Sequence, residues 1–125
     1  MSQNNPFIRG AKDAERRVRE MSIHEFTSIP ITERPLLVDV RTEDEWDDGH
    51  AEGAVHLCAG AIEERIREIV TDSTTPIVCY CVDGERSALV AEELSELGYT
   101  HVASLSGGLK AWLSAKEPIV HPASR

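Results

Sequence analysis

The chain has 125 residues, and a hydrophobic content of 41% is enough for one domain to bury a core without disulfides or metals. A formal net charge of −9 disfavours attraction to nucleic acid phosphates and to anionic lipid surfaces, so we expect neither as a partner. The three cysteines indicate no disulfide framework, and no apolar run forms a leader or approaches the roughly 18 residues of a membrane span, so we expect a cytoplasmic protein.

Three parts are predicted along the chain. Residues 1–20 form an N-terminal extension that could be helical on the domain surface, since residues 11–21 have a helix-forming composition with few apolar anchors. Residues 21–118 form the domain. Residues 119–125 are expected to be a surface tail, because the end of the chain has two prolines and little periodicity.

The first half of the domain has two helix starts around one strongly apolar strand. Ser22 and Glu25 form a capping box, which predicts a helix through about Ile29. Residues 36–40 are apolar apart from one carboxylate, as expected of a central parallel strand with both faces covered. Thr42 then begins a second capping box.

The second half alternates short strands with longer helical patterns. Strands are predicted over residues 54–57, 77–80 and 101–105, and helices over residues 61–70 and 88–97. Gly107-Gly108 leads into a last short helix that contains Leu109 and Trp112. The connections between these strands are too long for tight hairpins. This alternation predicts an α/β fold with three layers, in which a mostly parallel sheet of four to five strands is flanked by helices on both faces.

Cys81 lies in a loop between the apolar run of residues 77–80 and the helical pattern that follows. Ligands of parallel α/β sheets bind at the carboxyl ends of strands, and a loop that leads into a helix points several backbone N–H groups at its centre. These groups stabilise an anion, and thiols at helix N-termini ionise more readily than free ones. Cys81 is therefore the nucleophile candidate, with Gly84 permitting a tight turn that a side chain would block.

Three separated blocks of sequence, taken together, resemble the rhodanese-like sulfurtransferase family. They are Asp39-Val40-Arg41 with Glu45 and Gly49-His50-Ala51-Glu52-Gly53-Ala54, then Cys81-Val82-Asp83-Gly84-Glu85-Arg86-Ser87, then Leu105-Ser106-Gly107-Gly108 with Trp112. Their order and spacing cover nearly the whole domain. The chain resembles a single-domain rhodanese.

The resemblance implies that Cys81 accepts a sulfane sulfur from thiosulfate or another persulfide donor, carries it as a persulfide, and passes it to a thiol or cyanide. It implies that the following loop holds the sulfur, with Arg86 adding a cation or bracing the loop and Ser87 capping the helix or donating its hydroxyl. The loop consists of Val82, Asp83, Gly84, Glu85, Arg86 and Ser87. No cofactor is expected, and no metal either, because the histidines and cysteines show no close ligand cluster in the sequence. The expected partners are a small sulfur donor or a protein persulfide and a thiol acceptor, for a monomer or weak homodimer.

Two features of the loop discriminate between substrates. Four residues separate Cys81 from Arg86, which looks like the sulfurtransferase length, whereas the related dual-specificity phosphatases and arsenate reductases carry one more. Asp83 and Glu85 leave the loop formally negative, so a dianionic donor meets repulsion. We therefore predict weak use of thiosulfate. The sequence does not choose the better donor or acceptor, which could be a protein persulfide, a small persulfide or a cationic protein surface.

The other chemistry-bearing residues have structural interpretations. Asp39 and Arg41 follow another strand and could line the same crevice, but the expected role is to tie down loop backbone. His50 is expected to form a hydrogen bond, because a thiolate needs no general base. Cys79 is expected in the core rather than in a redox pair with the loop cysteine, since adjacent strand geometry suits a disulfide poorly. Cys58 has no predicted role.

Two other functions stay open. The domain could be a binding or regulatory module with an incidental thiol, its N-terminal extension docking a partner. Retention of Cys81, Gly84 and Arg86 favours catalysis over this alternative, because inactive relatives commonly lose the cysteine. A phosphatase or arsenate reductase of the same fold is the other alternative, which the short loop disfavours.

Overall fold

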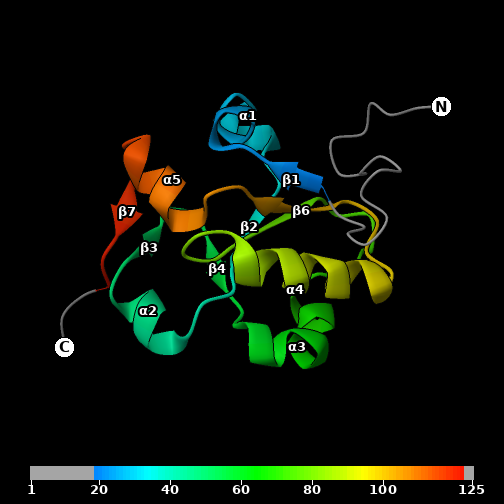
Figure 1. Cartoon of the computed structure of the whole chain (residues 1–125). Coiled ribbons are helices and arrows are strands. Elements are labelled where there is room, and N and C mark those ends of the chain that lie inside the picture. The colour runs from blue at the N-terminus through cyan, green and yellow to red at the C-terminus, as the bar shows by residue number, and fades with distance from the viewer. Residues whose placement is uncertain (1–18, 123–125) are drawn as a thin grey trace.

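The computed structural model describes residues 19–122, so the helix expected over residues 11–18 and the last residues of the tail lie outside the described part. Five parallel strands form the main sheet in the order β1-β6-β5-β2-β4 (Figure 1). These strands are β1 (Arg19–Met21), β2 (Leu36–Asp39), β4 (Val55–His56), β5 (Ile77–Tyr80) and β6 (Val102–Leu105). The predicted α/β fold with a mostly parallel sheet is confirmed.

Helices cover both faces of this sheet. α1 (Ile23–Thr27) and α5 (Gly108–Ser114) lie on one face, and α3 (Ile62–Ile69) and α4 (Glu85–Glu96) lie on the other (Figure 1). α2 (Glu43–Asp47) follows the carboxyl end of β2. None of the helices within residues 19–122 combines the length and the apolar character that a bilayer crossing requires.

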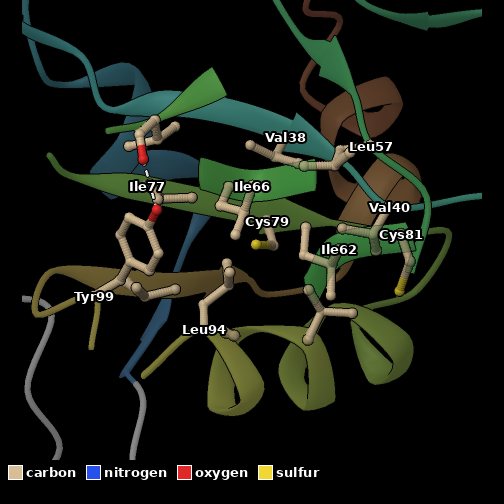
Figure 2. Close-up of a cluster of buried hydrophobic side chains, with 14 residues drawn as sticks. Val38, Val40, Leu57, Ile62, Ile66, Ile77, Cys79, Cys81, Leu94 and Tyr99 are labelled. Carbon is tan, nitrogen blue, oxygen red and sulfur yellow. Dashed lines mark hydrogen bonds between the residues drawn. The ribbon is translucent and has the colours of Figure 1, made fainter. Parts of the chain in front are cut away.

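The core has one hydrophobic cluster on each face of the sheet, and β5 contributes to both. Cys79 and Cys81 point into the cluster beside α3 and α4. Val78 and Tyr80 point into the cluster beside α1 and α5. Figure 2 shows the first cluster, in which Cys79 lies among aliphatic side chains. Burial on both faces explains why this strand has an uninterrupted apolar sequence.

Both predicted capping boxes are present. The Ser22 hydroxyl accepts a hydrogen bond from the Glu25 N–H at 3.0 Å, and the Glu25 carboxylate accepts one from the Ser22 N–H at 2.9 Å. Thr42 and Glu45 form the same pair at the start of α2. Each box satisfies N–H groups that a helix end leaves unpaired, so these short helices are fixed at their first turns. α1 ends at Thr27, slightly earlier than expected.

Both ends of the described chain differ from the expectation. Residues 19–21 form β1 instead of the end of a helix, because their backbone pairs with β6 and Met21 is buried. Near the other end, β7 (Ile119–Val120) pairs antiparallel with β3 (His50–Ala51) where a tail was expected. Strands of two or three residues are too short to show a periodic pattern, so tertiary pairing decides them.

The loop after β5 is covered by the first turn of α5. The Leu109 N–H donates to the Cys81 carbonyl at 2.8 Å, and the Lys110 N–H donates to the Val82 carbonyl at 3.1 Å. Gly108 has a φ of +53°, in the left-handed region that favours glycine. A Cβ at this position would lie 2.3 Å from the Cys81 carbonyl oxygen. The close approach of α5 to the loop therefore requires glycine.

Replacing Gly108 by alanine should disrupt the docking of α5 on the loop. The left-handed backbone and the clash with the Cys81 carbonyl both oppose the added methyl, so we expect the free energy of unfolding to fall by at least about 2 kcal/mol. Urea denaturation followed by circular dichroism measures this loss. Gly60→Ala is the matched control, because nothing lies within 4 Å of a Cβ there. Equal stability of the two variants would contradict the interpretation.

Candidate active site

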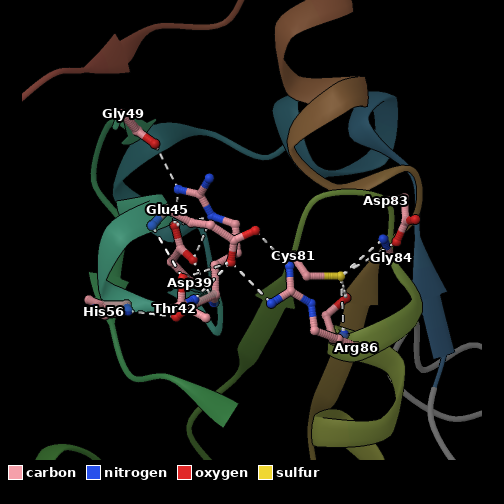
Figure 3. Close-up of polar contacts among 11 residues, drawn as sticks. Asp39, Thr42, Glu45, Gly49, His56, Cys81, Asp83, Gly84 and Arg86 are labelled. Atoms are coloured by element: carbon pink, nitrogen blue, oxygen red, sulfur yellow. Dashed lines mark hydrogen bonds and ion pairs between the residues drawn. The ribbon is translucent and has the colours of Figure 1, made fainter. Parts of the chain in front are cut away.

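Cys81 follows β5 directly, and its side chain is fully buried at the base of the loop. Its sulfur accepts a backbone hydrogen bond from the Gly84 N–H at 3.1 Å (Figure 3) and a second one from the Ser87 N–H at 3.4 Å. The Ser87 hydroxyl lies 3.5 Å from the same sulfur. The loop therefore surrounds one sulfur atom with hydrogen-bond donors, an environment that stabilises negative charge on it.

The local sequence explains this path of the backbone. Gly84 has a φ of +106° and forms the N-cap of α4, so the chain turns sharply where a side chain would be strained. Asp83 Oδ1 accepts a hydrogen bond from the Glu85 N–H at 3.1 Å and closes the turn. α4 begins at Glu85, which puts Ser87 in the first turn, where backbone N–H groups have no partner within the helix. The backbone N–H of Ser87 donates to the Cys81 sulfur instead.

Of the two loop carboxylates, that of Asp83 contacts the Cys81 sulfur. Asp83 and Glu85 are both exposed. Asp83 Oδ1, the atom that closes the turn, nevertheless lies 3.9 Å from Cys81 Sγ. A negative charge so close to the sulfur opposes the approach of an anionic substrate.

Arg86 braces the loop against α2. Its guanidinium contacts the Glu45 carboxylate twice, Nη1 to Oε1 and Nη2 to Oε2, each at 3.1 Å (Figure 3). The hydrogen bond from Arg86 lowers the pKa of Glu45 to about 2, although burial opposes this shift, and the Thr42 N–H adds to it. Of the two roles expected for Arg86, these hydrogen bonds fit the brace, and the guanidinium also interacts electrostatically with Cys81 and Asp83. Arg41, the other arginine of this region, pairs with Asp39.

A buried network of Asp39, Arg41 and Tyr80 holds the neighbouring strand ends together. The Asp39 carboxylate accepts hydrogen bonds from Arg41 Nη2 at 2.8 Å and from the Tyr80 hydroxyl at 2.5 Å. Arg41 Nη2 also donates to the Gly49 carbonyl at 2.7 Å, and the Tyr80 hydroxyl accepts from the Ala51 N–H at 3.0 Å. Burial and the hydrogen bond to Asp39 raise the pKa of Tyr80, so its hydroxyl stays neutral. A scaffold role fits both Asp39 and Arg41.

Two histidines support α2. His50 Nδ1 lies 3.2 Å from the Trp46 carbonyl oxygen, and its ring stacks on the Trp46 indole with 3.4 Å between ring centroids. His56 also stacks on this indole, at 4.9 Å, and its Nε2 lies 2.8 Å from the Arg41 carbonyl oxygen. The hydrogen bond expected for His50 is therefore present, and it belongs to the scaffold.

All three cysteines are free thiols. Cys79 is fully buried, and this burial, with a smaller effect of Cys81, raises the pKa of Cys79 to about 12. Such a thiol stays protonated near neutral pH, which fits the core role expected for it. Cys58 is half-buried. Within residues 19–122, no group of three His, Cys, Asp or Glu side chains could hold a metal ion.

Sequence reasoning did not identify Tyr80, His56 and Ser104 as parts of this region. Tyr80 and Ser104 lie in strands that look purely structural, and their partners are distant in the chain. The Ser104 hydroxyl oxygen, for example, lies 2.7 Å from that of Ser87. The available signal is a polar atom in an otherwise buried strand, because such an atom requires a hydrogen-bond partner.

Comparisons with known proteins agree with this geometry. A family model described as Rhodanese-like domain matches residues 22–115. The thiosulfate sulfurtransferase PspE of Escherichia coli (strain K12) is 36% identical over 83 residues, which cover 66% of this chain and 79% of PspE. A crystal structure of thiosulfate sulfurtransferase from Pseudomonas aeruginosa superposes with a TM-score of 0.73 and 32% identity, covering 80% of this chain and 19% of that one.

One similar structure has a different description. It is a protein of unknown function from Rhodopseudomonas palustris, described as a possible tyrosine phosphatase. It superposes with a TM-score of 0.75 and 26% identity, covering 96% of this chain and 99% of that one.

The ion pair between Arg86 and Glu45 should make the free energy of unfolding depend on pH in the acidic range. Because the pKa of folded Glu45 lies below its usual value of 4.5, the stabilisation is complete above that value and is lost as the pH falls towards about 2. The difference in free energy of unfolding between wild type and Glu45→Gln should be largest near neutral pH and shrink in acid, as measured by urea denaturation. Glu68→Gln, which removes an exposed ion pair with Arg65, should show a smaller trend. A pH-independent difference for Glu45→Gln would refute the interpretation.

Proposed function

This chain belongs to the family of rhodanese-like domains, and on that basis we propose that it is a sulfurtransferase that carries a sulfane sulfur as a persulfide on Cys81. The observation that carries the proposal is the convergence of the Gly84 and Ser87 N–H groups on the Cys81 sulfur. Relatives named thiosulfate sulfurtransferases support the same activity.

The loop supplies what each half of such a cycle requires. In the loading step, the Cys81 thiolate attacks the outer sulfur of the donor, and the electron pair of the broken bond leaves with the donor residue, which is sulfite for thiosulfate. In the discharge step, a thiolate or cyanide attacks the terminal sulfur, and the electron pair of the broken S–S bond returns to Cys81. Sulfur carries negative charge throughout, and fixed N–H donors stabilise it without reorganisation.

The charges beside the loop favour a donor other than thiosulfate. The two arginines of the region are already paired, Arg86 with Glu45 and Arg41 with Asp39. The two carboxylates of the loop are exposed, and that of Asp83 lies near the sulfur. A dianion therefore meets the like charge of these carboxylates, and the Arg86 cation that would offset it is shared with Glu45. The better donor in this proposal is a persulfide with less negative charge, either a small molecule or a protein with a cationic surface.

A phosphatase is the second candidate, because of the likeness to the Rhodopseudomonas palustris protein. Two features of the loop oppose it. Only four residues separate Cys81 from Arg86, one fewer than in the related phosphatases, which makes a narrower cradle. The Arg86 guanidinium is also engaged by Glu45 rather than directed at an incoming phosphate.

Incubation with thiosulfate or a polysulfide should add one sulfur atom to Cys81. Because the attacking atom is the Cys81 sulfur, intact-mass spectrometry should show this gain in mass for the wild type and no gain for Cys81→Ser. Cyanide should remove the added sulfur and yield thiocyanate.

Cys79→Ser and Cys58→Ser are the matched controls, and both should keep the gain in mass. Equal sulfur loading of Cys81→Ser and wild type would exclude Cys81 as the carrier. Robust hydrolysis of a phosphate ester that is lost in Cys81→Ser would support the phosphatase instead.

Reversing the charge of the loop should improve thiosulfate turnover. In Asp83→Lys/Glu85→Lys, two negative charges of the loop become positive, so we expect kcat/KM for thiosulfate to rise by about tenfold at low salt and less at high salt. Cyanide-dependent thiocyanate formation measures it. Glu64→Lys/Glu68→Lys on α3 makes the same change in net charge on exposed residues and should alter kcat/KM little. Unchanged kinetics in the loop variant would remove the electrostatic argument.

A further inference from the structure

Ser104 connects the sheet to the sulfur through a second buried hydroxyl. It lies opposite Cys79 in the register of β6 and β5 and is 1% exposed. Its hydroxyl oxygen lies 2.7 Å from that of Ser87, which is also fully buried. Ser87 Oγ lies 3.5 Å from Cys81 Sγ. Three polar atoms therefore form a chain from β6 to the sulfur.

This chain can be ordered in two directions, because each hydroxyl has one proton to donate. In the first, the Cys81 thiol donates to Ser87, Ser87 donates to Ser104, and Ser104 donates to the Gly84 carbonyl. In the second, Ser104 donates to Ser87, and Ser87 donates to the sulfur. The first order suits a protonated thiol, and the second suits an anionic sulfur.

The distances favour the second order. The Ser104 hydroxyl lies 2.7 Å from Ser87 Oγ but 3.5 Å from the Gly84 carbonyl oxygen. That carbonyl already accepts a hydrogen bond from the Ala88 N–H at 3.3 Å. A proton given to Ser87 forms a hydrogen bond of ordinary length, whereas one given to Gly84 forms a weak one. Donation from Ser104 to Ser87 leaves the Ser87 proton for the sulfur.

We propose that Ser104 is a positioning residue, which orients the Ser87 hydroxyl to donate to the Cys81 sulfur when that sulfur is anionic. The catalytic consequence rests on the proposed sulfurtransferase function. In the discharge step, the electron pair of the broken S–S bond returns to Cys81, and the Ser87 hydroxyl then donates to the charge that forms. Unlike the backbone N–H of Gly84, this hydroxyl can turn, and Ser104 sets its direction.

A double-mutant cycle tests whether Ser104 acts through Ser87. The rate of alkylation of Cys81 by iodoacetamide is measured against pH in Cys58→Ser protein, with Ser104→Ala and Ser87→Ala introduced singly and together. Ser104→Ala should slow alkylation at neutral pH by about three- to tenfold and move the pH profile upward, as expected for a weakened hydrogen bond to a charged group. With Ser87 already replaced, Ser104→Ala should have little further effect, because the donor that it orients is gone.

Two further variants separate orientation from packing. Ser104→Thr keeps the hydroxyl and should retain the pH profile, and Ser114→Ala removes an exposed serine of α5 and should change nothing. An equal effect of Ser104→Ala with and without Ser87, or no effect with Ser87 present, would overturn the proposal. The rate of sulfur discharge to cyanide, expected to fall in Ser104→Ala, is the second readout. If Cys81 takes up no sulfur at all, the proposed function fails while the alkylation cycle still decides the role of Ser104.

Discussion

The backbone after β5 is held from both sides, and the candidate site depends on this constraint. The N–H groups of Gly84 and Ser87 point inward at the sulfur of Cys81. The carbonyl groups at the start of the loop point outward to the first turn of α5. One short segment satisfies both sets of partners only because it turns at Gly84 and because α5 approaches closely at Gly108. The surroundings of the sulfur are thus set mainly by the path of the backbone.

The arginines near the sulfur are paired with carboxylates of the scaffold, so they offset little of the negative charge of the loop. Arg41 donates its hydrogen bonds within the Asp39 network, and Arg86 joins the loop to α2 through Glu45. The carboxylates of Asp83 and Glu85 therefore set the charge around the loop. The net charge of the whole chain disfavours nucleic acid and anionic lipid surfaces as partners. Around the Cys81 loop, the negative charge of Asp83 and Glu85 disfavours anionic substrates in the same way.

The fold and the position of Cys81 at the end of a strand could be predicted because their signals are local. The apolar run of β5, the glycine of the loop and the capping boxes each act within a few residues. The contacts that could not be predicted join distant segments: Arg86 with Glu45 and Tyr80 with Asp39 are each separated by 41 residues. β1 and β7 escaped prediction for the same reason, since a strand of two or three residues exists only through its partner strand.

The alternation of side chains along β5 separates chemistry from scaffold. Cys79 and Cys81 face α3 and α4, whereas Val78 and Tyr80 face α1 and α5. The two faces of one strand therefore have different structural tasks. A substitution on the Tyr80 face alters how the strand ends are joined and leaves the packing around the Cys81 sulfur in place. A substitution on the opposite face or in the loop alters the surroundings of that sulfur while the network that joins the strand ends stays the same.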